Sequence, residues 1–338
     1  MTLTRPRWVL IIAAIVVVVL FGAGLTDMIY RQKQTSSGCV TTSTPTALAH
    51  PVALGNYHST NLPIGQRVLG TYAASGPDET LWNLAPLTQL ERKLGGYQFG
   101  IVSGFTAGII SCVANLQAVA AADRASLISY DIPWNFSDIL AGKYDATLND
   151  AAGKLKSVDG PVYLRMFAEF NDQWPVWSVA NNHPMVTSHH EWIATWRHVV
   201  SIYRAAGATN VHFVWDPNGV DEPSSDHLES YWPGSAWVDV IGFDIYAWKG
   251  QSTDLVHLYQ APYNRLVALD PSKPIWITES GIGESSAKPG AISRLFASTR
   301  YPHLQALVWF SIKKEEDWRI DSSVSSLVPW QALHNSTR

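Results

Sequence analysis

The stretch PVYLRMFAEFNDQWPVW, residues 161–177, begins as an apolar run and ends among polar residues and tryptophans. Only Arg165 interrupts the apolar run between Val162 and Phe167. A run of this length, bounded by a Gly-Pro pair before it and an Asn-Asp pair after it, is typical of a strand buried on both faces. Glu169 stands where the run gives way to polar residues. The stretch therefore predicts a buried strand with a carboxylate at its carboxyl end.

A second stretch, PIWITESG at residues 274–281, has the same plan and places Glu279 near its end. A carboxylate at the end of a buried strand, with Trp174 and Trp177 nearby, is typical of enzymes that act on sugars. One such carboxylate alone is equally well explained by a capping or loop position. Two of them, at the ends of two buried strands, favour a catalytic pair.

The composition argues against several other classes of function. A net charge of −4 without a long basic run argues against nucleic acid as a partner. The sequence has no glycine-rich phosphate loop, no HExxH and no CxxC, and its histidines, including His189 and His190, lack metal-ligand spacing. We therefore expect no metal and no organic cofactor. The 15 tryptophans suit both a large core and surfaces that stack on sugar rings.

Residues 8–25, WVLIIAAIVVVVLFGAGL, contain no charged side chain and follow Arg5 and Arg7. Such a run is just long enough to cross a bilayer core of about 30 Å. No convincing small-x-small cleavage site follows it, which favours a retained anchor over a cleaved signal peptide. We expect residues 1–30 to be a membrane anchor or signal segment. The rest of the chain is then exported, as the extracellular part of a single-pass membrane protein or as a secreted protein.

Residues 31–50 are rich in Ser, Thr and Pro and have little to bury, so we expect a linker there. We expect residues 51–338 to form one catalytic domain, since a single barrel needs about 250 residues. Cys39 in the linker and Cys112 in the domain could form a disulfide bond in an oxidising compartment, but the sequence does not decide this.

Short apolar, β-rich runs alternate with amphipathic or alanine-rich segments throughout the expected domain. Eight strands separated by helices predict an α/β fold, a closed (β/α)8 TIM barrel, in which the side chains that act on substrate lie at the carboxyl ends of the strands. The expected strands are residues 67–72, 97–102, 126–130, 162–167, 211–215, 238–243, 275–278 and 306–310. The expected helices are residues 84–94, 113–122, 146–156, 190–206, 255–269 and 291–298.

On this barrel Glu169 follows the fourth strand and Glu279 ends the seventh, so both belong to the same end of the barrel. Because other polar and aromatic residues reach that end as well, we expect an active site there. The polar and aromatic residues at that end are Asp131 after the third strand, Asp216 and Asn218 after the fifth, Asp244 and Tyr246 after the sixth, and Trp309 near the end of the eighth.

Several motifs follow one another along the domain in a fixed order. They are ILAGKYD at residues 139–145, LRMFAEFN at 164–171, WPVW at 174–177, ATWRHVV at 194–200, FVWDPN at 213–218, VDVIGFDIY at 238–246 and ITESG at 277–281. In this order they resemble glycoside hydrolase family 26, which belongs to a clan of retaining enzymes with catalytic glutamates after strands four and seven. The family is best known for endo-β-mannanases and includes some lichenases and β-1,3-xylanases.

The resemblance implies that Glu169 is the general acid/base and Glu279 the nucleophile, with carboxyl groups about 5 Å apart. It also implies that Tyr246 orients Glu279 through a hydrogen bond. We expect Arg165 to supply a positive charge near Glu279, or else to form an ion pair of structural importance only. Apolar surroundings and the neighbouring carboxylate should raise the pKa of Glu169.

The resemblance further implies aromatic contacts with the sugars. Trp309 is expected beneath the sugar at the cleavage point, and Trp174 or Trp177 beside the leaving-group sugar, with core packing as the alternative. The remaining residues expected to bind substrate are Arg165, Asn171, Trp215, Asn218, Asp244 and Tyr246.

Two residues depart from the family pattern. Ala168 occupies a position that is usually histidine in the family's mannanases, and alanine has no donor for a sugar hydroxyl. Asp172 replaces a glycine and adds negative charge on the leaving-group side. We therefore expect a retaining, endo-acting O-glycosyl hydrolase that cleaves a β-linked polysaccharide, either β-mannan-like or another β-glycan. The alternative is a non-catalytic carbohydrate-binding barrel at the cell surface.

Overall fold

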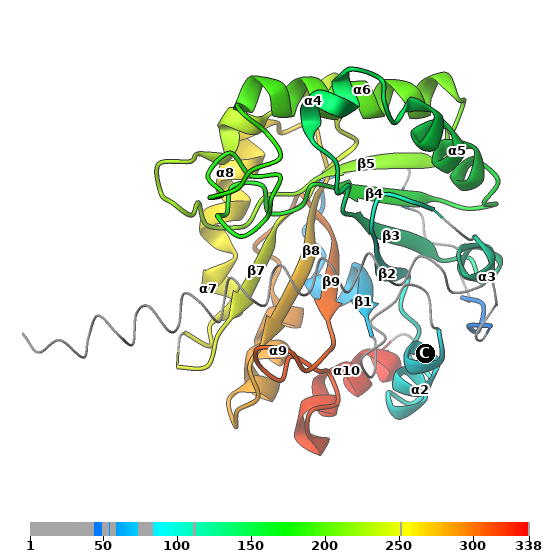
Figure 1. Cartoon of the computed structure of the whole chain (residues 1–338). Helices are drawn as coiled ribbons and strands as arrows, with labels where there is room; N and C mark the ends of the chain where they lie inside the picture. Colours follow the sequence, from blue (N-terminus) through cyan, green and yellow to red (C-terminus); the bar gives the residue numbers. More distant parts are fainter. Residues whose placement is uncertain are drawn as a thin grey trace, which may run out of the picture.

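The structure, a computed structural model, describes residues 44–48, 54, 59–73, 84–110, 113–250 and 252–336. Its centre is one sheet of parallel strands in the order β6-β5-β4-β3-β2-β1-β9-β8-β7, and a further pairing of β6 with β8 closes the sheet on itself. Figure 1 shows the strands at the centre and the helices around them. The predicted (β/α)8 barrel is therefore confirmed.

Nine strands are present in the described part of the chain, because β6 and β7 divide one position of the barrel between them. The backbone is not paired as a strand at Gly242 and Phe243, whose N–H groups donate to Trp215 O (2.8 Å) and Trp276 O (3.1 Å). The strands are β1 (Val68–Tyr72), β2 (Ile101–Thr106), β3 (Ala125–Tyr130), β4 (Val162–Met166), β5 (Val211–Trp215), β6 (Val240–Ile241), β7 (Asp244–Ala247), β8 (Ile275–Ile282) and β9 (Leu304–Phe310).

The helices cover the outside of the barrel, with α4, α5 and α6 along one side and α9 and α10 along the opposite side in Figure 1. The α-helices are α2 (Ala85–Lys93), α3 (Ala114–Ala121), α4 (Phe136–Leu140), α5 (Asp145–Lys156), α6 (His189–Ala205), α7 (Leu255–Leu258), α8 (Gln260–Leu269), α9 (Lys288–Ala297) and α10 (Val324–Ser336). Short 3-10 helices are η2 (Ile64–Gln66), η3 (Leu228–Tyr231) and η4 (Ser235–Trp237).

Three expected elements differ from the observed ones for local reasons. The second strand begins at Ile101 rather than 97 and runs through Ser103 and Gly104, which hide it from an apolar pattern. The helix expected over 255–269 divides into α7 and α8, because Pro262 has no N–H for an intrahelical hydrogen bond. The strand expected over 238–243 is broken at Gly242.

Side chains of successive residues on each strand point alternately into the barrel and out toward the helices. On β4 Tyr163 belongs to the cluster inside the barrel, whereas Leu164 and Met166 belong to the cluster between sheet and helices. Arg165 shares the inward face with Tyr163 and lies closer to the carboxyl end. The alternation therefore places the guanidinium of Arg165 inside the barrel, just below the end where Glu169 follows.

The segment 44–48, which falls in the expected linker, contacts the amino-terminal side of the barrel. Pro45 is buried, Leu48 N–H donates to Ala122 O (3.1 Å), and Arg124 Nη2 donates to Thr46 O (2.5 Å). None of the helices in the described residues is long and apolar enough to span a bilayer. The membrane segment expected at residues 8–25 lies outside the described residues, as do Cys39 and Cys112.

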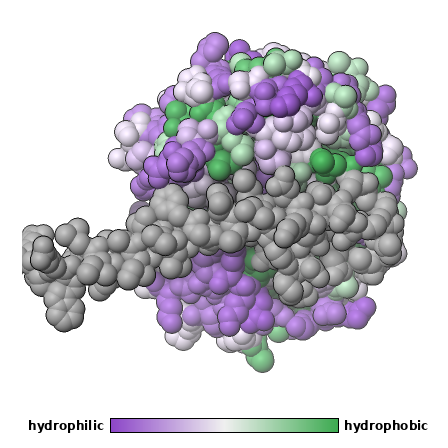
Figure 2. All heavy atoms as spheres, in the orientation of Figure 1, coloured by the Kyte–Doolittle hydropathy of each residue, from purple (hydrophilic) through white to green (hydrophobic). Residues whose placement is uncertain are grey.

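Hydrophilic residues predominate on the face of the molecule drawn in Figure 2, and hydrophobic residues are scattered among them. Among the described residues, Trp174 and Trp248 are the exposed tryptophans, at 49% and 41% exposure. Trp174 lies in the segment after β4, and Trp248 directly follows β7, so both lie toward the carboxyl end of the barrel. Aromatic faces at this end can stack on sugar rings.

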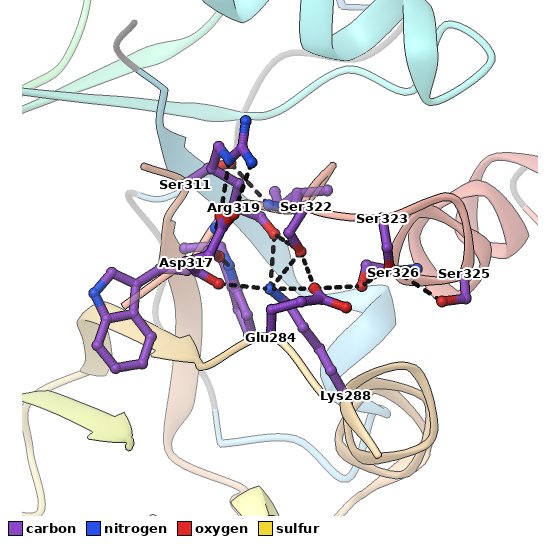
Figure 3. A network of polar contacts seen from close by, with 12 residues as sticks. Glu284, Lys288, Ser311, Asp317, Arg319, Ser322, Ser323, Ser325 and Ser326 are labelled. Carbon is purple, nitrogen blue, oxygen red and sulfur yellow. Dashed lines mark hydrogen bonds and ion pairs between the residues drawn. The ribbon is translucent and has the colours of Figure 1, made fainter. Parts of the chain in front are cut away.

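A buried lysine fixes the loop after β9 to the start of α9 (Figure 3). Lys288 Nζ donates to the backbone carbonyls of Asp317 (3.2 Å) and Arg319 (2.8 Å) and to Ser322 Oγ (2.9 Å), and its side chain is 0% exposed. The same loop carries Trp318, whose ring packs against Tyr246 with centroids 5.0 Å apart. Burial lowers the pKa of Lys288 to about 8, so the ammonium form still predominates at pH 7.

We predict that Lys288→Ala lowers the free energy of unfolding by about 3 kcal/mol, because buried carbonyl groups lose their donor. Chemical denaturation at pH 7 measures this change. Lys93→Ala is the control: its ion pair with Asp321 is at the surface, with the Lys93 side chain 55% exposed, and its loss should change stability by less than about 1 kcal/mol. Equal effects of the two substitutions would contradict the prediction.

Candidate active site

Arg165 lies at the centre of the polar groups inside the barrel, with its side chain 4% exposed. Nη1 donates to both carboxylate oxygens of Asp244, at 3.1 and 3.0 Å, and Nη2 donates to Glu279 Oε1 at 2.5 Å. Asp216 Oδ2 lies 3.2 Å from Nη1. One guanidinium thus contacts carboxyl groups on β7, on β8 and directly after β5, and it is the cation at the centre of the site.

Glu279 lies on β8 in register with Asp244 on β7 and is 8% exposed. Its Oε2 accepts a hydrogen bond from Tyr246 OH at 2.7 Å, so the predicted bond between these residues is present. Burial and the negative charge of Glu279 raise the pKa of Tyr246, which keeps the phenol protonated as a donor. Both oxygens of Glu279 are therefore fixed, one by a cation and one by a neutral hydroxyl.

Glu169 is presented by a turn with unusual backbone angles. Phe167 and Glu169 have φ values of +51° and +56°, a left-handed conformation that residues with a Cβ adopt rarely. Glu169 N–H donates to Asp216 O at 2.8 Å, and Trp177 Nε1 donates to Ala168 O at 2.7 Å. These two hydrogen bonds hold the turn directly after β4, and strain of this kind is concentrated at functional sites.

The Glu169 carboxyl group has neutral hydrogen-bond donors in place of a cation. Trp174 Nε1 donates to Oε2 at 2.8 Å, and Asn218 Nδ2 lies 3.3 Å from Oε1. The same Asn218 amide donates to Asp172 Oδ2 at 3.2 Å. Burial raises the pKa of Glu169 to about 8, with further increases from the charges of Glu279 and Asp172 that outweigh the opposing effect of Arg165. Glu169 is therefore protonated at neutral pH.

The structure brings most of the predicted site residues together at the carboxyl end of the barrel. Hydrogen bonds or ion pairs join them into two groups, one around each glutamate. The group around Glu279 contains Arg165, Asp244 and Tyr246, and the group around Glu169 contains Trp174 and Asn218. Within the described residues, no three or more His, Cys, Asp or Glu side chains are arranged to hold a metal ion.

Three tryptophans that were expected to bind substrate are instead part of the core, which for Trp177 is the alternative that the sequence left open. Trp215 and Trp309 are fully buried because they point outward from their strands, toward the helices. Their indole N–H groups donate to Tyr231 O (3.2 Å) and Trp318 O (2.8 Å). Trp177 is 3% exposed and supports the backbone of the turn before Glu169 rather than a sugar.

Asn171 is also too deeply buried to contact a substrate, at 0% exposure. Its Nδ2 donates to Asn218 O (3.0 Å) and to Asp221 Oδ1 (2.9 Å), and its Oδ1 accepts from Asn218 N–H (2.8 Å). Asn171 therefore positions the loop that carries Asn218. This role is structural, in contrast to the substrate contact that was expected.

Asp216 was expected at this end of the barrel without an assigned role, and Trp318 was not identified from the sequence; both side chains are buried and support the site rather than contact a substrate. Asp216 directly follows an apolar strand, the same signal that identified Glu169, but its neighbours in space are not visible in the sequence. Trp318 lies beyond β9 and contacts Tyr246, and Trp248 packs against it with ring centroids 5.0 Å apart. No pattern in the sequence connects Trp318 to β7, which carries Tyr246 and is directly followed by Trp248.

A family model described as glycosyl hydrolase family 26 matches residues 131–319. The chain is 31% identical to endoglucanase H of Acetivibrio thermocellus over 210 residues, which cover 59% of this chain and 23% of that protein. It is 33% identical to a mannan endo-1,4-beta-mannosidase of Bifidobacterium adolescentis over 117 residues, which cover 31% of this chain and 11% of that protein. The chain thus matches only a quarter or less of the length of these two curated relatives.

Solved structures share the fold. A modular endo-β-1,4-mannanase from Cellulomonas fimi has a TM-score of 0.59 and 17% identity, over 80% of this chain and 71% of that one. A β-mannanase from a symbiotic protist of the termite Reticulitermes speratus has a TM-score of 0.57 and 14% identity, over 87% of this chain and 97% of that one. At this level of identity the likeness establishes the barrel alone.

We predict that Glu279→Gln lowers the pKa of Glu169, because the substitution removes a neighbouring negative charge that favours the protonated form. Carbon-13 NMR titration of the glutamate carboxyl groups measures the shift, and Glu169→Gln identifies the signal. Asp150→Asn is the control, since Asp150 pairs with Lys154 on the surface of α5 and should leave the titration unchanged. An unchanged midpoint in Glu279→Gln would show that the two glutamates do not interact.

Proposed function

Because the chain belongs to glycosyl hydrolase family 26, we propose that it is a retaining, endo-acting glycosidase that cleaves a β-linked polysaccharide. The observation that carries the proposal is the difference between the two carboxyl environments. Glu279 is ion-paired to Arg165, whereas Glu169 meets only neutral donors and has a raised pKa of about 8. Double displacement requires one carboxyl group that keeps its proton, here Glu169, and one carboxylate that can attack, here Glu279.

In the proposed reaction Glu169 donates its proton to the glycosidic oxygen as the bond to the leaving group breaks. Glu279 Oε attacks the anomeric carbon, and a glycosyl ester forms. Glu169, now ionised, takes a proton from water, which displaces the sugar from Glu279 with net retention of configuration. Arg165 and Tyr246 orient the Glu279 carboxylate for attack and stabilise it when it departs.

We propose a β-glycan as substrate, since similar proteins are named endoglucanase, mannan endo-1,4-beta-mannosidase and beta-1,3-xylanase. Ala168 offers no side-chain donor to the sugar, and its carbonyl is already bonded to Trp177. The half-exposed Trp174, whose indole N–H donates to Glu169, presents an aromatic surface beside the proposed acid. We propose that it stacks on the leaving-group sugar.

We also propose that residues 8–25 anchor the chain in a membrane and that the barrel is exported, on the strength of the uncharged apolar run alone. Fractionation of cells that produce the full chain tests this directly. Recovery in the membrane fraction after alkaline carbonate washing supports an anchor. Release of a shortened protein into the medium would instead support a cleaved signal.

We predict that Glu279→Ala and Glu169→Ala each abolish most of the hydrolysis of the preferred β-glycan, with a loss of about four orders of magnitude for the nucleophile variant. The full-length protein is assayed on mannans, mixed-linkage glucans, xylans and exopolysaccharides, and proton NMR follows the anomeric configuration of the first product. Glu229→Ala is the control, because its ion pair with Arg265 is at the surface. Binding without hydrolysis in the unmodified protein would favour the carbohydrate-binding alternative, and inverted products would exclude double displacement.

We predict that kcat/KM falls as the pH rises through about 8, because Glu169 must be protonated to act as the acid and its pKa is raised to about 8. Initial rates measured between about pH 4 and pH 10, at intervals of about half a pH unit, define the alkaline limb of the kcat/KM profile. Asp172→Asn removes a negative charge beside Glu169 and should move the limb to lower pH. A limb that stays in place would show that Asp172 does not act on the titrating group.

A further inference from the structure

Asp216 contacts the surroundings of both proposed catalytic glutamates. It is the first residue after β5 and is fully buried. Its backbone carbonyl accepts the hydrogen bond from Glu169 N–H at 2.8 Å, within the strained turn after β4. Its carboxyl group accepts from the hydroxyl of Thr278, which directly precedes Glu279, and lies 3.2 Å from Arg165 Nη1. Asp216 is thus linked to Glu169 through its backbone and to Glu279 through its side chain.

The backbone around Asp216 leaves space for this side chain. A Cβ atom at Gly242 would lie 2.4 Å from Asp216 Oδ1 and 2.8 Å from Thr278 Oγ1. Both distances are shorter than van der Waals contact permits, so a side chain at this position would displace Asp216 or Thr278. Gly242 is also where the strand position divides into β6 and β7. The interrupted strand therefore accommodates a carboxyl group directly behind the active site.

The charges around Asp216 do not balance if every group is ionised. One guanidinium faces several carboxyl groups, and Asp216 Oδ2 and Asp244 Oδ2 lie 3.2 and 3.0 Å from the same nitrogen, Arg165 Nη1. Two carboxyl groups in a shared buried site retain one proton between them. Among the described residues no donor is aligned with Asp216 Oδ2, although Arg165 Nη1 lies 3.2 Å away, so an ionised oxygen there would have an ion pair but no hydrogen bond. A proton on this oxygen removes that penalty.

We propose that Asp216 is a positioning residue of the active site, which shares one proton with Asp244 and holds Arg165, Thr278 and the Glu169 turn in their relative places. This inference rests on the proposed function, because it assigns a role in the same reaction. With one proton on the pair, Arg165 faces two negative charges, one on Glu279 and one shared by the pair, in place of three.

Burial, the largest influence, raises the pKa of Asp216 to about 6, while Arg165 and the Thr278 hydroxyl oppose the increase. Burial also raises the pKa of Asp244 well above its usual range. Both increases favour the protonated form, so the pair holds a proton at higher pH than an isolated aspartate would. The groups that face the pair are Arg165 from β4, Glu169 from the turn after it, Tyr246 from β7, and Thr278 and Glu279 from β8.

Two substitutions at this position separate the charge of Asp216 from its hydrogen bonds. Asn in Asp216→Asn can accept from Thr278 and donate to Asp244, as a protonated aspartate does. It should retain at least about a third of kcat and leave the alkaline limb of kcat/KM within about 0.3 pH unit, since the charge of the pair is unchanged. Ala in Asp216→Ala makes neither bond, and kcat should fall at least about 30-fold while KM changes less than about threefold.

Glu91→Ala is the matched control, because it breaks a buried ion pair with Arg124 on the outer, amino-terminal side of the barrel. It should lower the thermal midpoint without changing the pH profile. A downward shift of about one pH unit or more in Asp216→Asn would show that both aspartates are ionised and would overturn the shared proton. Equal losses of kcat in the Asn and Ala variants, or a loss of less than about threefold in Asp216→Ala, would overturn the positioning role.

Glu279→Ala is measured in parallel. If it retains turnover, the proposed function fails. If it is inactive while Asp216→Ala retains wild-type kcat, only the positioning role fails. Should Asp216→Ala not fold, the pH profile and kcat of Asp216→Asn still decide the proposal.

Discussion

A single buried guanidinium sets the geometry of this active site. Arg165 points into the barrel from β4, and its charge cannot remain there without partners, since an unpaired buried charge is strongly destabilising. Asp244 and Glu279 satisfy it from neighbouring strands that are themselves in register. The location of the proposed nucleophile thus follows from a requirement of folding. A structural ion pair and a functional one are the same contact here, so the two interpretations of Arg165 are compatible.

The two glutamates differ because the barrel gives them different kinds of partner. Glu279 lies within the regular sheet, where inward-facing neighbours supply a cation and a phenol. Glu169 lies in a left-handed turn just beyond the sheet, where an indole and an amide are the available donors. Neutral donors reduce the pKa of a buried carboxyl group less than a cation does. The proposed division of roles therefore follows from one residue being inside the sheet and the other just outside it.

Much of this arrangement could be predicted from the sequence, because apolar runs reveal where buried strands end. Glu169 and Glu279 were found in this way. The direction of each side chain could not be predicted, since strands buried on both faces are apolar throughout and show no alternation. For this reason Trp215 and Trp309 were assigned to the sugar although they point toward the helices. The substrate contact predicted for Asn171 was wrong for a different reason, because the partners of its side chain come from a loop that is distant in the sequence.

The close approach at Gly242 also constrains how this barrel can diverge. Any larger residue at position 242 would collide with the Asp216 carboxyl group. If Asp216 were replaced by a smaller residue while Gly242 remained, the space that the carboxyl group now occupies beside Gly242 would be left unfilled. Neither position can change freely while the other is retained. Descendants of this chain should therefore keep both residues or replace both together, so we expect positions 216 and 242 to covary although they are distant in the sequence.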